Sequence, residues 1–165
     1  MSPSGTSLLR TATPEDLDDL YEVEVACFRR GRFREEHVAW ILANPNALTL
    51  VVPALDGLLG SIMLLFERKA CRVLSVAVIP SARRRGYGLE MMRAAEDAAR
   101  ARGCLAVRLE VSTQNTGAIE FYRRLGYAVD GVLYGYYSWG EDAYSMAKPV
   151  VAAAPPATTN IETSR

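Results

Sequence analysis

A glycine-rich turn between an apolar strand and a helix constrains this chain most, in the segment SVAVIPSARRRGYGLEMM at residues 75–92. A helix start leaves backbone N–H groups without partners inside the helix, and the aligned peptide dipoles make that end partly positive. Gly86 and Gly88 let a ligand approach the backbone closely, and the three arginines before them add forked donors. The segment therefore predicts an anion site suited to a phosphate or pyrophosphate.

Two better-known phosphate loops do not fit this segment. The P-loop needs a Gly-Lys pair followed by Ser or Thr, which is absent, and the dinucleotide fingerprint needs a third glycine where this chain has Met91. On the turn alone, a solvated basic helix start remains an open alternative.

Composition excludes several classes of function. The 19 basic and 19 acidic residues give a formal net charge of zero, so no global field favours nucleic acid or a membrane surface. We see no signal peptide and no apolar run of membrane-spanning length. Cys27, Cys71 and Cys104 are odd in number and form no C-x-x-C pair, so we expect neither a disulfide framework nor a metal site. Free thiols fit a reducing compartment, and the cytoplasm is the default expectation.

Hydrophobic periodicity predicts one α/β (α+β) domain over residues 6–150, with flexible termini at 1–5 and 151–165. Thr13 is a plausible N-cap for the first helix, with Pro14 at the first helical position. The order is β-α-α-β-β-β-α-β-α-β-β, which indicates helices packed on a mixed, largely antiparallel sheet. The expected elements are strand 7–12, helices 13–28 and 35–45, strands 47–53, 58–68 and 71–80, a helix from about 86 to 102, strand 105–111, helix 115–126, and strands 128–137 and 143–150.

Two motifs give the chain a resemblance to the GNAT superfamily of N-acetyltransferases. Arg83, Gly86 and Gly88 fill the fixed positions of its acyl-CoA-binding signature after an apolar strand. Asn115 and Tyr122, followed by a Gly-Tyr pair, fill its second signature in the expected order. The segments LEVSTQN and YGYYSWGEDAYSMAKPV are similar to the RimI and archaeal Ard type of protein N-terminal acetyltransferase.

The resemblance implies acetyl-CoA as co-substrate and assigns roles to particular residues. Glu110 would be the general base and Tyr122 the general acid that protonates the departing thiolate. Phe33, Tyr136 and Tyr137 would contact the acceptor, although the arginine-rich turn around Phe33 can equally be a solvated turn. The cofactor would bind to Val76, Ala77, Val78, Arg83, Arg84, Arg85, Gly86, Tyr87, Gly88 and Asn115.

The leading prediction is thus acetylation of protein or peptide N-termini by a monomer or homodimer. A lysine side chain or a small-molecule amine remains an alternative acceptor, and a CoA-binding module without turnover is a third possibility. The presence of both Glu110 and Tyr122 disfavours the last, because a pure binder needs neither residue. Two departures from the family pattern are Tyr87, at a usually aliphatic position, and the segment 27–38, which lacks the proline common in bacterial RimI proteins.

Overall fold

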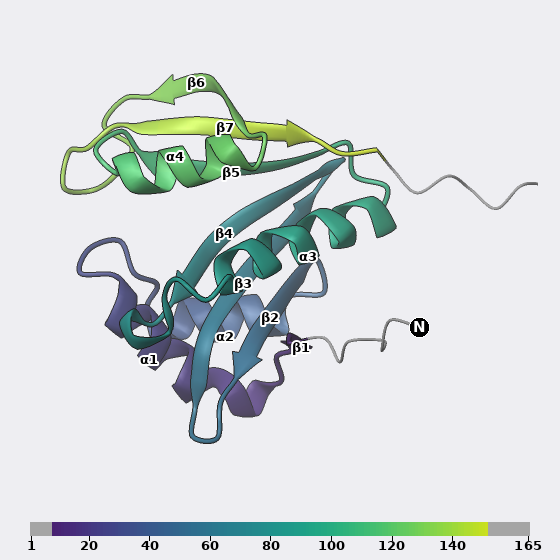
Figure 1. Ribbon diagram of the computed structural model, residues 1–165, viewed down its shortest axis with the longest axis vertical. Helices are drawn as coiled ribbons and strands as arrows, with labels where there is room; N and C mark the ends of the chain where they lie inside the picture. Colours follow the sequence, from purple (N-terminus) through teal and green to yellow (C-terminus); the bar gives the residue numbers. More distant parts are fainter. Residues whose placement is uncertain (1–7, 152–165) are drawn as a thin grey trace, which may run out of the picture.

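The computed structural model describes residues 8–151 of the chain (Figure 1). Its elements follow the predicted order, with two short 3-10 turns added. They are β1 (Arg10–Thr11), η1 (Pro14–Asp16), α1 (Leu17–Cys27), α2 (Glu35–Ala43), β2 (Ala47–Pro53), β3 (Leu58–Glu67), β4 (Ala70–Val78), η2 (Pro80–Ala82), α3 (Tyr87–Ala101), β5 (Ala106–Ser112), α4 (Thr116–Arg124), β6 (Ala128–Leu133) and β7 (Ala143–Pro149).

The strands form one seven-stranded sheet in the order β1-β2-β3-β4-β5-β7-β6. Every neighbouring pair is antiparallel except β4 and β5, which are parallel. The predicted α/β fold with a largely antiparallel sheet is therefore confirmed. The parallel pair requires a crossover, and α3 supplies it.

Two apolar clusters cover opposite faces of the sheet. In Figure 1, α3 crosses in front of β2–β4 while α2 lies behind them. Met91 and Met92 of α3 pack with Ile62 and Leu64 of β3, whereas α1 and α2 pack on the other face around Met63. Successive residues of a strand point to opposite faces, so one continuous apolar run in β3 serves both clusters.

Element boundaries differ from the sequence-based expectation at two strands. The first strand is confined to Arg10–Thr11. The strand expected over 128–137 ends at Leu133, because Gly135 adopts a left-handed φ of 60° and its N–H donates to Asp142 Oδ1 at 2.7 Å. Tyr136 and Tyr137 therefore lie in the β6–β7 loop. The expected flexible termini, apart from Val151, lie outside the described residues.

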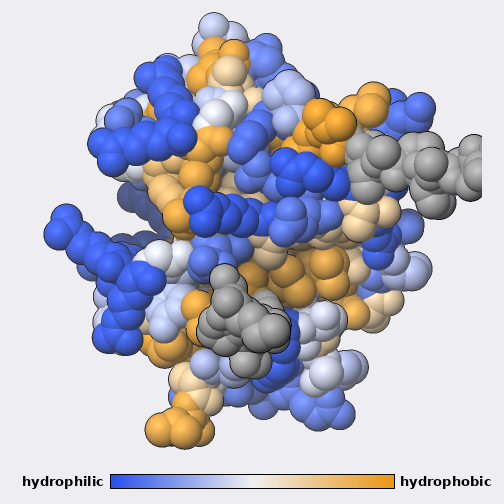
Figure 2. All heavy atoms as spheres, turned by 45° about the vertical axis from the view of Figure 1, so that its right-hand side comes forward, coloured by the Kyte–Doolittle hydropathy of each residue, from blue (hydrophilic) through white to orange (hydrophobic). Residues whose placement is uncertain are grey.

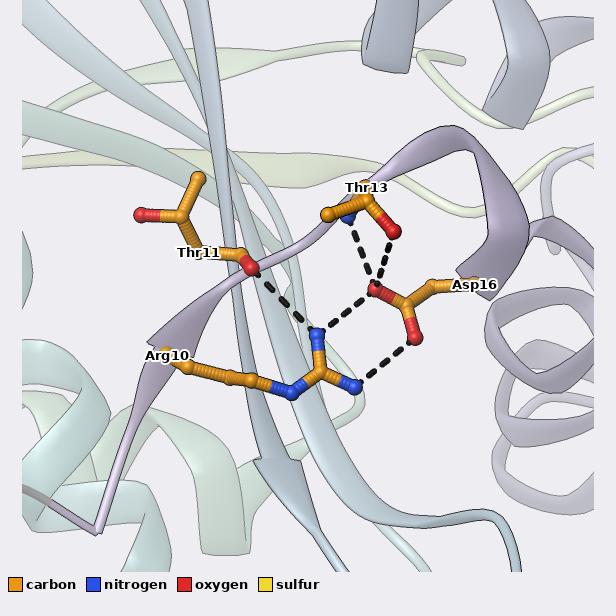
Figure 3. A network of polar contacts seen from close by, with 4 residues as sticks. All are labelled: Arg10, Thr11, Thr13 and Asp16. Atoms are coloured by element: carbon orange, nitrogen blue, oxygen red, sulfur yellow. Dashed lines mark hydrogen bonds and ion pairs between the residues drawn. The ribbon is translucent and has the colours of Figure 1, made fainter.

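A compact polar network fixes the start of α1 (Figure 3). Thr13 is the N-cap of the 3-10 turn that leads into the helix, with Pro14 directly after it, as expected. The Asp16 carboxylate accepts the Thr13 backbone N–H at 2.8 Å and both terminal nitrogens of the Arg10 guanidinium at 2.8 and 2.9 Å. Two forked charge-assisted bonds thereby tie β1 to the helix start.

Figure 2 shows long hydrophilic side chains projecting from one face, with apolar residues between them. The β2–β3 turn projects at the bottom of the molecule and carries Leu55, which is fully exposed. Scattered apolar residues of this kind are normal on a globular surface.

Candidate active site

Strands β4 and β5 separate halfway along their length. Their parallel pairing runs only from Ala70↔Ala106 to Val73↔Leu109. The register between β3 and β4 shifts directly afterwards, since Leu64 pairs with Val73 and Met63 with Ser75. Leu74 is thus the extra residue of a β-bulge, which bends a strand and increases its twist. The bulge coincides with the point where β4 leaves β5.

Beyond the bulge, β4 has one open edge. Val76, Ala77 and Val78 pair with Ile62, Ser61 and Gly60 of β3, and no strand of the described chain pairs with their other side. An extended ligand can therefore add to this edge through backbone hydrogen bonds.

The loop after β4 presents free backbone donors. The N–H groups of residues 84–88 donate no hydrogen bond to any other residue within 8–151. Gly86 has φ 84°, and a Cβ added there would meet no atom within 4 Å, so open space lies above the helix start. Arg84 also adopts a left-handed φ of 64°. These features fit the pyrophosphate of a CoA-type ligand.

Neighbouring side chains of this loop have structural contacts of their own. Arg83 Nε donates to the Val78 carbonyl at 3.0 Å, so this arginine folds back onto the end of β4. Tyr87 is half-buried against the α3 core cluster, which explains why an aromatic residue fits at this helix start. A Cβ on Gly88 would lie 3.5 Å from the ring of Phe121 in α4, at ordinary van der Waals distance, so α3 and α4 approach each other at this glycine.

Glu110 lies on β5 just beyond the point where the two strands separate. Buried Leu109 and Val111 alternate with partly exposed Arg108 and Glu110, as strand periodicity predicts. The Glu110 carboxylate forms an ion pair with Arg72 Nε at 3.2 Å. Arg72 Nη2 also donates to the Tyr136 hydroxyl at 3.0 Å, so a single guanidinium orients both groups.

A cavity of about 700 Å³ opens beside Glu110. Phe33, Tyr136 and Tyr137, the three residues expected to contact the acceptor, all line it. Tyr137 stacks on Trp139 with ring centroids 4.6 Å apart, and burial raises the pKa of its phenol to about 12. Aromatic walls around one carboxylate suit the end of a peptide or another small amine.

Tyr122 lies in α4 and Asn115 directly precedes that helix. Both are across the β4–β5 split from residues 76–78 of β4. Burial raises the pKa of the Tyr122 phenol to about 12, and nearby Tyr137 adds to the shift. The charge of Glu110 also contributes to the raised pKa of Tyr137. Asn115 is the N-cap of α4, since its Oδ1 accepts the Ala118 N–H at 3.2 Å.

Comparison with known proteins identifies the family. Residues 17–127 match the family model described as "Acetyltransferase (GNAT) family". This chain belongs to the GNAT family of acetyltransferases. The match spans both helices before β2, the glycine-rich turn and α4. The resemblance to the GNAT superfamily noted in the sequence is thereby confirmed.

The relatives of this GNAT acetyltransferase include archaeal and bacterial proteins. It is 27% identical to an N-alpha-acetyltransferase of Saccharolobus solfataricus, over 86% of this chain and 92% of the relative. Ard1 of Thermoplasma volcanium is also 27% identical, with a TM-score of 0.78 over 87% of this chain and 97% of that one. The ribosomal-protein-S18-alanine N-acetyltransferase of Escherichia coli shares the fold, with a TM-score of 0.80 at 23% identity over 90% and 97% of the two chains. The RimI and Ard likeness is thus confirmed.

Several residues of the GNAT site lay outside the sequence-based interpretation. The cavity is also lined by Arg72, His37, Trp40 and Trp139. His37 and Trp40 are three apart on α2, a spacing that puts them on one helix face and could have revealed them. Nothing in the sequence pattern pairs Arg72 with Glu110, because that contact depends on the β4–β5 register.

The described residues also bear on metal binding, thiol chemistry and membrane insertion. Within residues 8–151, no group of three or more His, Cys, Asp or Glu side chains is arranged to hold a metal ion. Cys27, Cys71 and Cys104 are free thiols. None of the helices in that range is long and apolar enough to cross a membrane.

Proposed function

We propose that this GNAT acetyltransferase transfers the acetyl group of acetyl-CoA to the α-amine of a protein or peptide N-terminus. The observation that carries the proposal is the location of Glu110. Its carboxylate lies where the open edge of β4 meets the aromatic cavity. A base at that junction would reach an amine in the cavity and an acyl donor along the strand.

The free backbone groups support acetyl-CoA as the donor. Acetyl-CoA would supply the thioester whose acetyl group is transferred. Residues 76–78 would hold its pantetheine arm and residues 83–88 its pyrophosphate, and the Asn115 side-chain amide would donate to it. The Oδ1 atom of Asn115 is engaged in the α4 cap, so its amide nitrogen is the group left for a ligand.

Glu110, which lines the cavity, and Tyr122 of α4 would each move one proton. Glu110 accepts a proton from the attacking amine, and Tyr122 donates its phenolic proton to the departing sulfur. An α-amino group has a pKa near 8, so roughly a tenth is already neutral at pH 7, against well under a thousandth of lysine side chains. A carboxylate, acting directly or through one water, therefore suffices for N-termini.

The names of two relatives favour this acceptor, because they describe an N-alpha-acetyltransferase and a ribosomal-protein-S18-alanine N-acetyltransferase. A lysine side chain or a small-molecule amine is the second enzyme candidate, since a cavity of about 700 Å³ has the volume for either. We further propose that the protein is a monomer or homodimer and that it is cytoplasmic, a location that the three free thiols support.

A peptide panel tests the proposal. Purified protein is mixed with acetyl-CoA and short peptides that differ in their first residue, each with a free and with a blocked α-amine. We expect acetylation of free α-amines only, located by tandem mass spectrometry. Acetylation of blocked, lysine-containing peptides would show that the acceptor is a lysine side chain and not the α-amine. Tight acetyl-CoA binding without turnover on any peptide or small amine would support the binding-module alternative.

A further inference from the structure

The loop between α1 and α2, residues 28–34, forms one wall of the cavity beside Glu110. Phe28 and Phe33 anchor it by packing against the α1–α2 core cluster. Gly31 lies directly against Trp139, since a Cβ there would be 2.7 Å from the indole ring. The loop is thus held in place from two sides, and its remaining side chains must point outward.

Those remaining side chains are arginines, and they have almost no partners. All four are exposed, and none forms an ion pair or side-chain hydrogen bond with a residue inside the described range. One, Arg30, is close enough to Glu141 for their charges to interact. The four are Arg29, Arg30, Arg32 and Arg34.

The acids nearby offset this charge only in part. Glu35 and Glu36 lie in the first turn of α2, where the helix dipole already stabilises negative charge. Glu141 accepts hydrogen bonds from Ser112 and Trp139. Glu24 lies beneath the loop, fully buried, and accepts the Ser75 hydroxyl at 2.6 Å. Four cations in seven residues therefore remain largely uncompensated in the loop that contributes Gly31 and Phe33 to the cavity wall.

The surface on the other side of Glu110 is also basic. A second cavity of about 810 Å³ shares Arg72 and Glu110 with the first. Arg68, Lys69 and Arg108 line it against one further acid, Glu67. Arg108 is paired with Asp130, whereas Arg68 and Lys69 form no ion pair with another described residue. An acceptor chain that extends from Glu110 along either cavity therefore passes a surface with excess positive charge.

We propose that the acceptor is a polypeptide whose N-terminal segment is acidic after its first residue or two. The inference rests on the proposed function, because it takes the aromatic cavity as the site of the acceptor's first residue. Carboxylates that follow would face Arg29, Arg30 and Arg32 and raise both affinity and association rate. The chain's formal net charge of zero means that this attraction is local to the site.

The test compares peptides with one shared first residue and either Glu, Gln or Lys at positions three to six. We expect kcat/KM for the Glu peptide to exceed that for the Gln peptide about tenfold and that for the Lys peptide by more. The differences should lie mainly in KM and should shrink as salt rises, since exposed charges are screened. The double variant R30E/R32E should abolish or reverse the order.

A matched control separates local from global charge. R100E/R124E makes the same change in net charge at two helix positions, partly exposed Arg100 of α3 and exposed Arg124 of α4, and should keep the preference for Glu peptides. The variant R29Q/R32Q removes two charges without reversing them, and it replaces R30E/R32E in the test if charge reversal disturbs the loop. The melting temperature of each variant is measured to detect such a disturbance. Equal kcat/KM for all three peptides, or an order that R30E/R32E leaves intact, would overturn the inference.

Binding measured without turnover distinguishes the two proposals. Fluorescence anisotropy of the three peptides with acetylated α-amines reports charge preference alone, and the Glu peptide should bind tightest. Acetylation without charge preference would remove this inference and leave the proposed function standing. Charge-selective binding without acetylation of any peptide would remove the proposed function. A single-stranded oligonucleotide of equal charge that binds as tightly as the Glu peptide would overturn the peptide assignment.

Discussion

At the scale of single residues, Arg72 connects the acceptor cavity to the candidate base. Its guanidinium contacts the Glu110 carboxylate at 3.2 Å and the Tyr136 hydroxyl at 3.0 Å. A planar guanidinium with fixed donor directions holds both partners in one geometry. If the β6–β7 loop moves when an acceptor binds, Arg72 would therefore shift the position of the Glu110 carboxylate.

The first prediction concerns Glu110→Gln. The amide keeps the size of the side chain but cannot accept a proton from the amine, so turnover should fall by about 10²–10⁴-fold, as for loss of a general base. Acetyl-CoA affinity, measured by calorimetry, should change less than about threefold. Glu120→Gln, at an exposed carboxylate of α4, is the control and should retain full activity. Wild-type turnover in Glu110→Gln would remove this residue from its proposed role.

At the scale of elements, the loop 28–34 and the β6–β7 loop meet at one close contact, Gly31 against Trp139. Gly31 has φ 69°, a region that residues with a Cβ adopt only with strain. Trp139 in turn stacks on Tyr137. The shape of the acceptor cavity thus depends on the absence of a side chain at one position.

Gly31→Ala should enlarge KM for the acceptor about tenfold or more, because its Cβ would displace the stacked Trp139 and Tyr137. KM for acetyl-CoA should stay close to the wild-type value. Gly103→Ala is the matched control: Gly103 has φ 73°, with no atom within 4 Å of an added Cβ. It shares the backbone strain, worth about 1–2 kcal/mol, without the contact. Equal acceptor KM in both variants would contradict the prediction.

The start of α1 gives a prediction of stability against pH. Hydrogen bonds from Arg10 lower the pKa of the Asp16 carboxyl from its ordinary 3.8 to about 2. A lowered pKa contributes stability above pH 4 that is lost as pH falls through about 2. Asp16→Asn should therefore cost about 1–2 kcal/mol of unfolding free energy at pH 7, allowing for screening of the half-exposed Arg10.

Urea unfolding at pH 7 and at pH 2.5 measures this effect. The difference in unfolding free energy between wild type and Asp16→Asn should be smaller at pH 2.5. Asp18→Asn, at an exposed position in the first turn of α1, is the control and should change stability by no more than about 0.5 kcal/mol. A gap of equal size at both pH values would show that Asp16 acts without its charge.

At the scale of the whole molecule, the sheet consists of two parts joined by four residue pairs between β4 and β5. The proposed acetyl-CoA site lies in the split between these parts, with residues 76–78 on one side and α4 on the other. A ligand there would connect the two parts and stabilise the complete fold.

Acetyl-CoA at about 100 times its Kd should therefore raise the unfolding free energy by about 2.7 kcal/mol. For a domain of this size that corresponds to about 5–11 °C in Tm, measurable by differential scanning fluorimetry. Adenosine 3′,5′-bisphosphate, which lacks both the pyrophosphate and the pantetheine arm, is the comparison ligand and should give a much smaller shift at equal concentration. Equal Tm shifts for the two ligands would show that the pyrophosphate and the pantetheine arm add little binding energy, and would contradict binding along the open edge of β4.

Periodicity and local chemistry predicted much of this protein from the sequence alone. Apolar spacing predicted every strand and helix in order, and the glycines at 86 and 88 predicted the open helix start. These features depend on residues close together in the chain, where dihedral preferences and dipoles act directly. The end of β6 was misjudged because aromatic residues favour strands in general, whereas Gly135 ends this one with a left-handed φ.

The acceptor side of the site required the tertiary structure. The Arg72–Glu110 pair, the contact of Gly31 with Trp139 and the burial of Glu24 against Ser75 each join residues 38 or more positions apart. The first depends on the register of β4 against β5, and the other two on how α1 and the two loops pack, which no local pattern encodes. The sequence by itself determined the class of fold and the glycine-rich turn at the start of α3. Only long-range packing decided which side chains line the cavity beside Glu110.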